Sequence, residues 1–380
     1  MKELIYFPEN ELKPTGGPRG YLYNLNKGLE EIGEKSIFFL PPQKKTSNKN
    51  KIKEWIPYRL LQLKNAIRFS NLDKEKDPVM VDFSEYDIIH FHRTDDLYRC
   101  REQLEKYNGK IVLTSHAPCA RHVELSNLLA PVDKKIFAKK LTGLEQMDAY
   151  AFRKADYVVF PCADAEEPYF HTWNNYENVR MEEKLRYLPT GIEKCVAKKT
   201  KNEVREKYGI PRDAFVVCYV GRHNEIKGYD IVKSVGKKLL QNENNYVMIA
   251  GKEEPLKGLN HDRWIEVGWT NDPHSIIAAA DVFILPNRET YFDLIMLEVL
   301  SLGQIIVASR TGGNKYFEQF DCEGIQLYQT EKELEQKIKE IQNMSLQDRK
   351  KMMRANLDLY EKNFTLKTFA QKYVDLMRSL

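Results

Sequence analysis

The stretch of sequence that decides the fold is Phe215-Val216-Val217-Cys218-Tyr219-Val220-Gly221-Arg222-His223-Asn224-Glu225-Ile226-Lys227-Gly228. Its first six residues form an uninterrupted apolar run, which is typical of a strand buried on both faces of a parallel sheet. Gly221 then allows a sharp turn, because glycine adopts backbone conformations closed to other residues. After the second glycine the sequence favours a helix that begins near Tyr229. A strand, a glycine loop and a helix in this order indicate an α/β fold.

Short apolar runs of the same kind recur along the whole chain. In the first half they are Leu4–Phe7, Ser36–Leu40, Ile88–Phe91, Ile111–Thr114, Tyr157–Phe160 and Leu185–Leu188. In the second half they are Phe215–Val220, Tyr246–Ala250, Trp264–Val267, Val282–Leu285, Ile305–Ala308 and Gly324–Leu327. Stretches of helical period separate these runs. We therefore expect two Rossmann-like, doubly wound α/β domains in tandem.

The joint between the two domains is predicted at Leu188-Pro189-Thr190-Gly191-Ile192-Glu193. Its proline and glycine, followed by the polar stretch Lys194–Asn202, fit a linker better than a helix. The first domain is therefore expected over residues 1–189 and the second from residue 190. Open α/β sheets bind ligands at the carboxyl ends of their strands. Two such domains facing each other would enclose a central cleft, and the chemistry is expected there.

The composition of the 380 residues narrows the class of protein. An apolar fraction of 42% supports globular folding, and 59 basic against 55 acidic residues leave a net charge of only +4. This balance disfavours a disordered chain and a nucleic-acid-binding protein. The start of the chain lacks a signal-peptide pattern, and no apolar stretch of about 18 residues occurs. We therefore expect a cytoplasmic protein whose six scattered cysteines are buried reduced thiols, not a disulfide frame or a zinc site.

Two cationic residues in the opening stretch predict an anion site. Arg222 offers a planar fork of donors, and Lys227 offers a point charge to the same anion. The positive end of the helix that begins near Tyr229 would add to the attraction. A diphosphate is the natural ligand for this set of donors. The alternative is that both residues are solvated surface charges in a loop.

A second candidate site follows the apolar run Val282–Leu285. A polar turn from Pro286 leads into an apolar helix that carries Glu298. A carboxylate on such a helix costs stability unless it has partners, and the two hydroxyls of a ribose would be suitable ones. The alternative is that Glu298 caps a loop or pairs with a lysine. The next apolar run then ends in another glycine turn at Thr311-Gly312-Gly313.

These motifs, taken in order, resemble the family 4 glycosyltransferases, which are retaining enzymes with the two-domain GT-B fold. The second half carries Gly-Arg…Lys-Gly, then Pro…Phe-x-Leu-x-x-x-Glu, then Thr-Gly-Gly. The first half carries Pro14-Thr15-Gly16-Gly17-Pro18-Arg19-Gly20, Asp87-Ile88-Ile89-His90-Phe91-His92, Val112-Leu113-Thr114-Ser115-His116 and the Leu188–Glu193 hinge. The resemblance implies that the last helix, within Phe364–Leu380, completes the first domain, and that the nucleotide-sugar domain spans 190–363.

The roles of the family's residues carry over to matching positions. Arg222 and Lys227 would bind the donor diphosphate and offset the charge that develops as the glycosidic bond breaks. Glu298 would hold the ribose hydroxyls, and His116 would lie near the transferred sugar. Main-chain donors around Phe292, Asp293 and Leu294 would meet the sugar or the phosphate, and Gly16 and Gly17 would allow close backbone approach. The resemblance also implies that transfer needs neither a divalent metal nor another cofactor.

The sequence departs from the family's pattern at one donor position. The family places a glutamate four residues after the proline, where this chain has Thr290, with Glu289 one residue earlier. Either a bulge brings Glu289 into place, or Thr290 contacts the sugar itself. Asp293 stands where the family often has glycine, and either touches a sugar hydroxyl or caps the following helix. The pair His90 and His92 resembles a metal pair, but no matching ligand cluster follows in the sequence.

The segment 43–69 is basic and rich in apolar side chains. It holds eight basic residues against the single acid Glu54, with Trp55, Ile67 and other large apolar residues interleaved. This composition fits contact with an anionic membrane surface or with an acceptor. It fits equally well a loop and an amphipathic helix packed on the first domain.

The sequence therefore predicts a metal-independent, retaining hexosyltransferase of polysaccharide biosynthesis. It would move a hexose or N-acetylhexosamine from a UDP-linked donor to a glycan, lipid-linked or protein acceptor. We expect a cytoplasmic enzyme, at the inner face of the membrane if 43–69 touches lipid. The alternative is a non-catalytic, glycosyltransferase-like partner subunit that binds the acceptor or stabilises an active enzyme, and Thr290 in the place of a glutamate motivates it.

Overall fold

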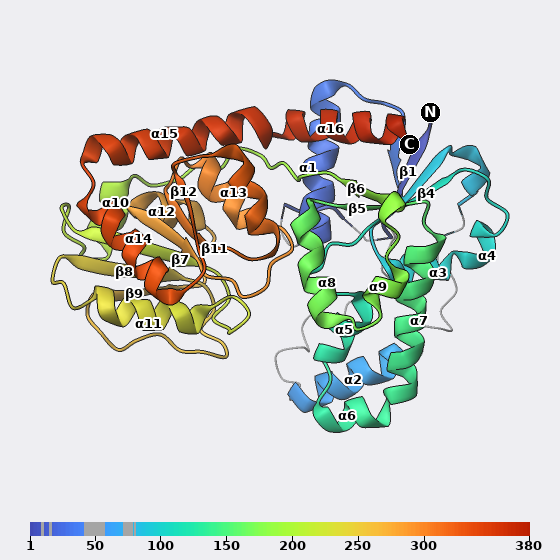
Figure 1. Cartoon of the computed structure of the whole chain (residues 1–380), viewed down its shortest axis with the longest axis horizontal. Helices are drawn as coiled ribbons and strands as arrows, with labels where there is room; N and C mark the ends of the chain where they lie inside the picture. The colour runs from blue at the N-terminus through green and yellow to red at the C-terminus, as the bar shows by residue number, and fades with distance from the viewer. Residues whose placement is uncertain (9–10, 15–16, 42–57, 71–78, 80) are drawn as a thin grey trace. The chain divides into compact units, whose positions relative to one another are not determined.

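The computed structural model describes residues 1–8, 11–14, 17–41, 58–70, 79 and 81–380. The chain divides into two compact units, each built around one parallel sheet (Figure 1). Unit 1 comprises Met1–Pro161, Glu166–Pro189 and Ala370–Leu380, and unit 2 comprises Cys162–Ala165 and Thr190–Phe369.

Unit 1 contains a six-stranded sheet of order β2-β1-β3-β4-β5-β6, in which every pair is parallel. Its strands are β1 (Glu3–Tyr6), β2 (Ile37–Phe39), β3 (Ile88–Phe91), β4 (Lys110–Thr114), β5 (Tyr157–Phe160) and β6 (Leu185–Tyr187). Its helices are α1 (Gly17–Ile32), α2 (Tyr58–Ser70), α3 (Thr94–Arg99), α4 (Arg101–Leu104), α5 (Arg121–Asn127), α6 (Pro131–Ile136), α7 (Ala138–Lys154), α8 (Glu167–Thr172) and α9 (Tyr176–Val179). Short 3-10 helices cover Phe83–Glu85 and Glu182–Lys184.

Unit 2 repeats this plan with a sheet of order β12-β11-β10-β7-β8-β9. Its strands are β7 (Phe215–Val220), β8 (Asn245–Ala250), β9 (Trp264–Gly268), β10 (Val282–Leu285), β11 (Ile306–Ser309) and β12 (Ile325–Tyr328). Its helices are α10 (Lys201–Lys207), α11 (Tyr229–Leu239), α12 (Pro273–Ala279), α13 (Leu294–Ser301), α14 (Glu331–Asn343) and α15 (Leu346–Asn363). The 3-10 helix η6 covers Gly312–Phe320, and η4 (Ala163–Glu166) and α16 (Leu366–Ser379) have residues in both units.

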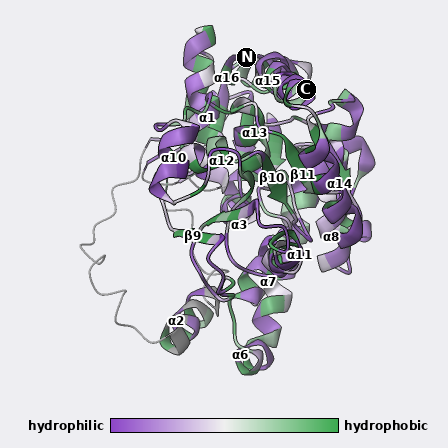
Figure 2. Ribbon diagram, turned by 90° about the vertical axis from the view of Figure 1, so that its left-hand side faces the viewer, coloured by the Kyte–Doolittle hydropathy of each residue, from purple (hydrophilic) through white to green (hydrophobic). Residues whose placement is uncertain are grey.

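Burial on both faces explains why the apolar runs became strands. In β7, Val217 and Tyr219 pack in one cluster with residues of α11 and α14, while Val216 and Cys218 are equally buried on the other face. The central strands β10 and β11 are coloured as hydrophobic, whereas α14 is largely hydrophilic (Figure 2). All twelve predicted runs are strands, and no end shifts by more than one residue, so the predicted α/β class with two parallel sheets is confirmed.

The end of the chain completes unit 1 through helix α16. Tyr373 is fully buried there and donates a hydrogen bond to Glu3 of β1, and its hydroxyl lies 2.7 Å from Nδ1 of His90 in β3. Arg378 also pairs with Glu34 at 2.9 Å. These contacts tie the final turns of α16 to β1, to β3 and to the segment between α1 and β2.

The structure corrects the expectation for the cysteines and describes only part of the basic segment 43–69. The cysteines are all free, but Cys119, Cys195 and Cys322 are partly exposed, so the expectation that all six are buried is wrong. Residues 42–57, and with them much of the basic segment 43–69, lie outside the described residues. Among those that are described, no helix has both the length and the apolar character needed to cross a membrane.

Candidate functional site at the carboxyl edge of the second sheet

The candidate site lies where parallel strands of unit 2 end. The loops after β7, β8, β10 and β11 begin at Gly221, Gly251, Pro286 and Arg310. Because the strands run in parallel, these loops gather at one edge of the sheet, which is where open α/β sheets bind ligands.

The loop after β7 is fixed tightly against the loop after β10. Gly228 adopts a φ of 66°, and a Cβ built on it would lie 1.8 Å from the carbonyl oxygen of Pro286, so only glycine fits this approach. The amide of Arg288 donates to the carbonyl of Ile226 at 2.9 Å. The Arg288 guanidinium also holds Asp230 through two hydrogen bonds of 2.6 Å. The backbone around Lys227 is therefore held in place by its neighbours.

Lys227 forms an ion pair across these two loops. Its Nζ lies 2.6 Å from Oδ2 of Asp293, and the side-chain amide of Asn287 donates to the same carboxylate. Asp293 precedes α13, but its side chain makes no capping hydrogen bond with that helix. Of the two interpretations of Asp293, the helix cap is therefore wrong, and its carboxylate instead orients Lys227.

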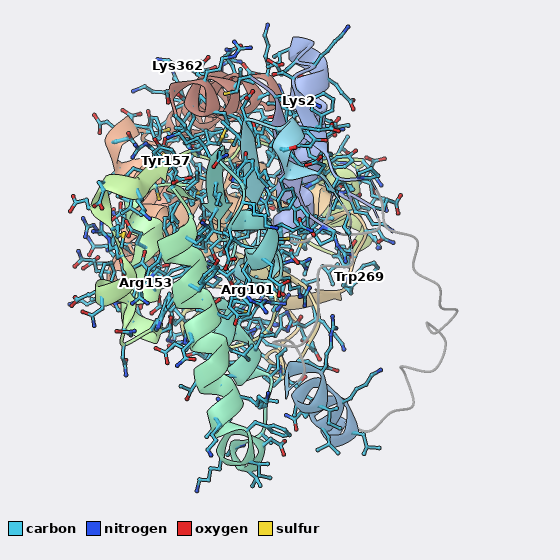
Figure 3. All side chains as sticks on the ribbon, turned by 90° about the vertical axis from the view of Figure 1, so that its right-hand side faces the viewer. Lys2, Arg101, Arg153, Tyr157, Trp269 and Lys362 are labelled. Atoms are coloured by element: carbon cyan, nitrogen blue, oxygen red, sulfur yellow. The ribbon has the colours of Figure 1, made fainter. Side chains whose placement is uncertain are left out.

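Arg222, in the same loop after β7 as Lys227, lines an open groove of about 520 Å³. Gly221, Gly251 and Thr270 line the same groove, together with Trp269, whose side chain is 72% exposed (labelled in Figure 3). An exposed tryptophan beside a basic side chain offers an aromatic face to a planar ligand. Trp269 was not predicted from the sequence, although its place two residues after the apolar run Trp264–Val267 was an available signal.

The turn at 289–294 packs closely on the glycines after β11. Thr290 is 1% exposed, and the amide of Gly313 donates to its carbonyl at 3.3 Å. Gly312 has a φ of 43°, and a Cβ on it would lie 2.0 Å from that same carbonyl oxygen. Glu289 is more exposed than Thr290. Thr290 therefore points into the packed turn, and Glu289 is the more accessible of the two.

The remaining residues predicted to bind the sugar donor lie at the start of α13. Phe292 is buried, and its ring stacks on Phe317 with 5.7 Å between ring centroids. Leu294 begins α13, so the amides at 292–294 belong to the first turn of that helix and its approach. Amides at a helix N-terminus lack partners within the helix and are suited to an anion or a hydroxyl.

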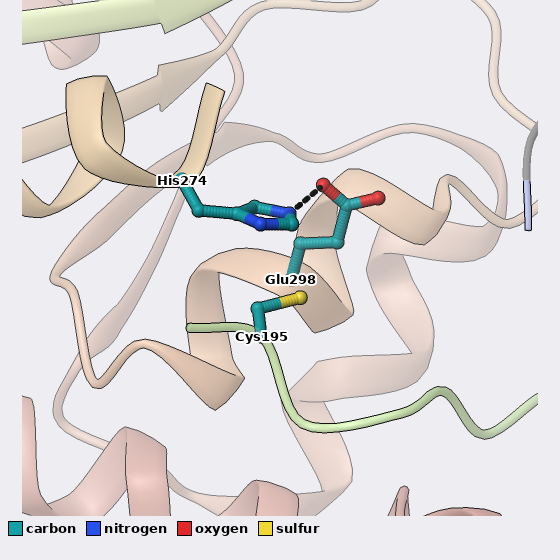
Figure 4. A group of neighbouring side chains, drawn as sticks. All are labelled: Cys195, His274 and Glu298. Atoms are coloured by element: carbon teal, nitrogen blue, oxygen red, sulfur yellow. Dashed lines mark hydrogen bonds and ion pairs between the residues drawn. The ribbon is translucent and has the colours of Figure 1, made fainter. Parts of the chain in front are cut away.

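Glu298 has partners that the sequence did not predict. Its Oε2 lies 3.2 Å from Nε2 of His274 in α12, and Cys195 completes the group (Figure 4). Hydrogen bonds to Cys195, the larger effect, and to Glu298 raise the pKa of His274 to about 10, because both favour the charged form of its ring. The predicted alternatives for Glu298 were a loop cap or a lysine, and the structure shows a histidine instead.

The first-domain residues Gly17 and His116 lie together in unit 1. Both line a cavity of about 310 Å³, and a Cβ on Gly17 would lie 3.8 Å from the carbonyl of His116. Nε2 of His116 lies 2.8 Å from Nδ1 of His92. Burial lowers the pKa of His116 to about 3, so its imidazole is neutral at physiological pH. Gly16 lies outside the described residues.

The pair His90 and His92 is not arranged as a metal pair. The hydroxyl of Thr114 lies 2.8 Å from Nε2 of His90, and the hydroxyl of Tyr373 lies near Nδ1. Both ring nitrogens of His90 are therefore occupied by hydrogen bonds. His223 is likewise buried, with its ring stacked on Tyr229 at 3.9 Å between centroids, and burial lowers its pKa.

Comparison with known proteins identifies relatives of part of unit 2. Residues 214–343, which contain β7 to α14, match the family model described as glycosyl transferases group 1. A UDP-Gal:alpha-D-GlcNAc-diphosphoundecaprenol alpha-1,3-galactosyltransferase from Escherichia coli is 28% identical over 37% of this chain and 40% of its own length. The chain thus spans under half of that relative.

Two further comparisons extend over most of the chain. The O-antigen biosynthesis glycosyltransferase WclY from Escherichia coli is 24% identical over 78% of this chain and 77% of its own length. The crystal structure of HepE from Anabaena in complex with UDP covers 100% of both chains, with a TM-score of 0.64 and 15% identity. This likeness shows that the fold is of the GT-B class.

Proposed function

We propose that the chain is a glycosyltransferase that takes a hexose or N-acetylhexosamine from a nucleotide-diphosphate sugar. The observation that carries this proposal is the position of two cations in one loop at the carboxyl edge of the unit 2 sheet: Arg222 lines an open groove, and Lys227 is held by Asp293. A diphosphate leaving group gains negative charge as the glycosidic bond breaks. Fixed cations at that point stabilise the transition state more than the ground state.

The ion pair with Asp293 prepares Lys227 for this role. The carboxylate of Asp293, 2.6 Å from Nζ, holds the lysine side chain in position before a donor binds. Because Arg222 and Lys227 supply positive charge themselves, we propose that transfer needs no divalent metal and no cofactor. Glu289 or Thr290 would contact the sugar, together with the amides at Phe292–Leu294.

Two features support a UDP-linked donor. Trp269 presents an exposed side chain in the lining of the groove, suited to stacking on a nucleobase. Glu298 would offer its carboxylate to the ribose hydroxyls. HepE binds UDP, and the E. coli galactosyltransferase is named for UDP-Gal. By the same likeness we propose that the reaction retains the anomeric configuration.

We assign the acceptor to unit 1, where Gly17 and neutral His116 line the same cavity. A neutral imidazole can donate or accept a hydrogen bond with a sugar hydroxyl. The relatives named above act in O-antigen synthesis or on a diphosphoundecaprenol-linked sugar. We therefore propose a glycan or lipid-linked acceptor in polysaccharide biosynthesis.

A lipid-linked acceptor would bring unit 1 to a membrane surface, and one face of this unit suits such contact. Leu60, Leu63 and Ile67 of α2 are 54%, 43% and 53% exposed, and Val132 and Ile136 of α6 are 58% and 69% exposed. The two helices lie side by side (Figures 1 and 2), and Ala66 of α2 packs with Leu125 and Leu129 of the α5 region. We propose that these five exposed side chains form one contact surface, which we call the α2–α6 face.

The test of the catalytic proposal is the double substitution Arg222→Ala plus Lys227→Ala. A thermal-shift panel of nucleotide sugars identifies the donor, since a ligand that binds the folded state raises the melting temperature. With that donor, the double variant is expected to lose UDP release by about a hundredfold or more. Its melting temperature without ligand should stay within a few degrees of the parent's.

The matched control removes an arginine and a lysine elsewhere in unit 2. Lys350 and Arg354 are exposed on α15, so Lys350→Ala plus Arg354→Ala should keep the parent's rate of UDP release. Full activity in the Arg222 and Lys227 double variant would contradict the diphosphate role. Donor binding without UDP release, in the presence of candidate acceptors, would favour the non-catalytic partner subunit.

A further inference from the structure

Three side chains of different chemistry converge around Glu298. The thiol sulfur of Cys195, a ring nitrogen of His274 and a carboxylate oxygen of Glu298 all lie within 4.8 Å of one another (Figure 4). Among the described residues, no other group of three such ligand atoms is this compact. The three residues come from the segment before α10, from α12 and from α13, all within unit 2.

The backbone around these side chains is fixed by further hydrogen bonds. The amide of Cys195 donates to Oγ of Ser301 at 3.3 Å, and Ser301 lies one turn after Glu298 on α13. His274 follows Pro273 in the first turn of α12, whose N-cap Asp272 accepts from the amide of Ser275. Supporting contacts of this kind hold metal ligands at a set separation.

We propose that Cys195, His274 and Glu298 form a binding site for zinc. A thiolate, a neutral imidazole and a carboxylate are the ligands that zinc prefers, whereas calcium and magnesium favour oxygen ligands. Zinc would therefore displace the ring proton of His274 to solvent when it binds. Three protein ligands leave one tetrahedral position for water. All three side chains are partly exposed, so an ion can reach them from solvent.

Zinc at this site would regulate the donor site by competition, an inference that rests on the proposed function. The carboxylate of Glu298 cannot hold the ribose hydroxyls and a zinc ion at once. Zinc is therefore not a catalytic metal here, and it would weaken the binding of UDP. The regulation would be reversible, since chelation restores the free carboxylate.

The test uses cobalt as a spectroscopic substitute for zinc in the full chain. Titration of chelator-treated protein with Co²⁺ should give a thiolate-to-cobalt absorption band that saturates with one ion per chain, and Zn²⁺ should displace it. Cys195→Ser should abolish the band, and His274→Gln should weaken the affinity by more than about tenfold. Cys322→Ser is the matched control, because Cys322 is also partly exposed, and it should keep the band.

The proposed competition between zinc and the donor is tested by measuring the affinity for UDP by calorimetry, with and without saturating Zn²⁺. The apparent Kd should rise by about tenfold or more in the parent and stay unchanged in Cys195→Ser. A missing cobalt band, or one that Cys195→Ser leaves intact, overturns the site. An unchanged Kd with zinc bound overturns the competition. Failure of the proposed function gives a different result, because the cobalt band then persists while UDP does not bind at all.

Discussion

Neutral histidines in unit 1 show how burial changes the chemistry of single residues. His92 and His116 lie 2.8 Å apart, and burial lowers the pKa of both, to about 3 for His116. The unfolded chain takes up a proton at each histidine near pH 6.5. Between these two pKa values unfolding takes up protons, so the stability of the folded chain falls as the pH is lowered from 6.5 toward 3.

His116→Gln should therefore make stability less dependent on pH. The free energy of unfolding of the parent falls as the pH is lowered from 6.5 to 5. In the variant this fall should be smaller, by at most about 1.4 kcal/mol per pH unit, because one titrating group is gone. Urea unfolding at several pH values measures the difference between the parent and the variant. Burial raises the pKa of Asp96 to about 6, so this carboxyl makes the folded chain more stable as the pH falls. Its effect is the same in the parent and the variant and cancels in the comparison. Equal pH slopes would contradict the prediction.

At the scale of elements, helices α2 and α6 of unit 1 leave several apolar side chains exposed. Ala66 of α2 is 1% exposed, whereas Ile136 of α6 is 69% exposed. Exposed lysines and an arginine accompany this face: Lys64 and Arg68 on α2, and Lys135 on α6. Apolar side chains flanked by basic ones are typical of a surface that rests on anionic lipid.

Val132→Asn plus Ile136→Asn should weaken binding to vesicles that contain anionic lipid. Each exposed side chain contributes about 1 kcal/mol on insertion, so the two together should lower the partition coefficient by about tenfold or more. Cosedimentation with vesicles measures this change. Val196→Asn serves as the control, because Val196 is 71% exposed in unit 2. Equal vesicle binding of the α6 double variant and the parent would rule out this face as the contact.

The elements themselves were largely predictable, but the pairing of distant side chains was not. Each run such as Phe215–Val220 carries its own signal, since a strand buried on both faces must be apolar throughout. The partners of Lys227 and Glu298 carry no such signal. Asp293 and His274 reach them only because the sheet order places their loops at one edge. Cys195 lies even farther from Glu298 along the chain than His274 does. The spacing of these residues in the sequence therefore could not indicate a set of metal ligands.

At the scale of the whole molecule, the chain returns to unit 1 after completing unit 2. Residues 370–380 belong to unit 1, although residues 190–369 precede them in unit 2. Tyr373 is the central contact, because its buried hydroxyl serves both Glu3 and His90. The need of Glu3 for a partner so distant in the sequence was not predicted.

Tyr373→Phe should destabilise unit 1 and leave unit 2 unchanged. Loss of the hydroxyl leaves the buried Glu3 and His90 without this partner, at a cost of about 1–3 kcal/mol. Hydrogen exchange should accelerate in β1 and β3, while the affinity for UDP stays that of the parent. Tyr360→Phe is the reciprocal control, because its hydroxyl donates to Ile192 at 2.9 Å within unit 2. Accelerated exchange in unit 2 of the Tyr373 variant would contradict the prediction.

The late return of α16 also has a consequence for biosynthesis. As the chain leaves the ribosome, β1 and β3 emerge well before Tyr373, with all of residues 190–369 translated in between. At common elongation rates this delay lasts on the order of ten to forty seconds. During that time the first-made unit carries Glu3 and His90 without their final partner, whereas unit 2 can close as it appears. The nascent first half is thus the part most exposed to chaperones and proteases, and the order of maturation is the reverse of the order of synthesis.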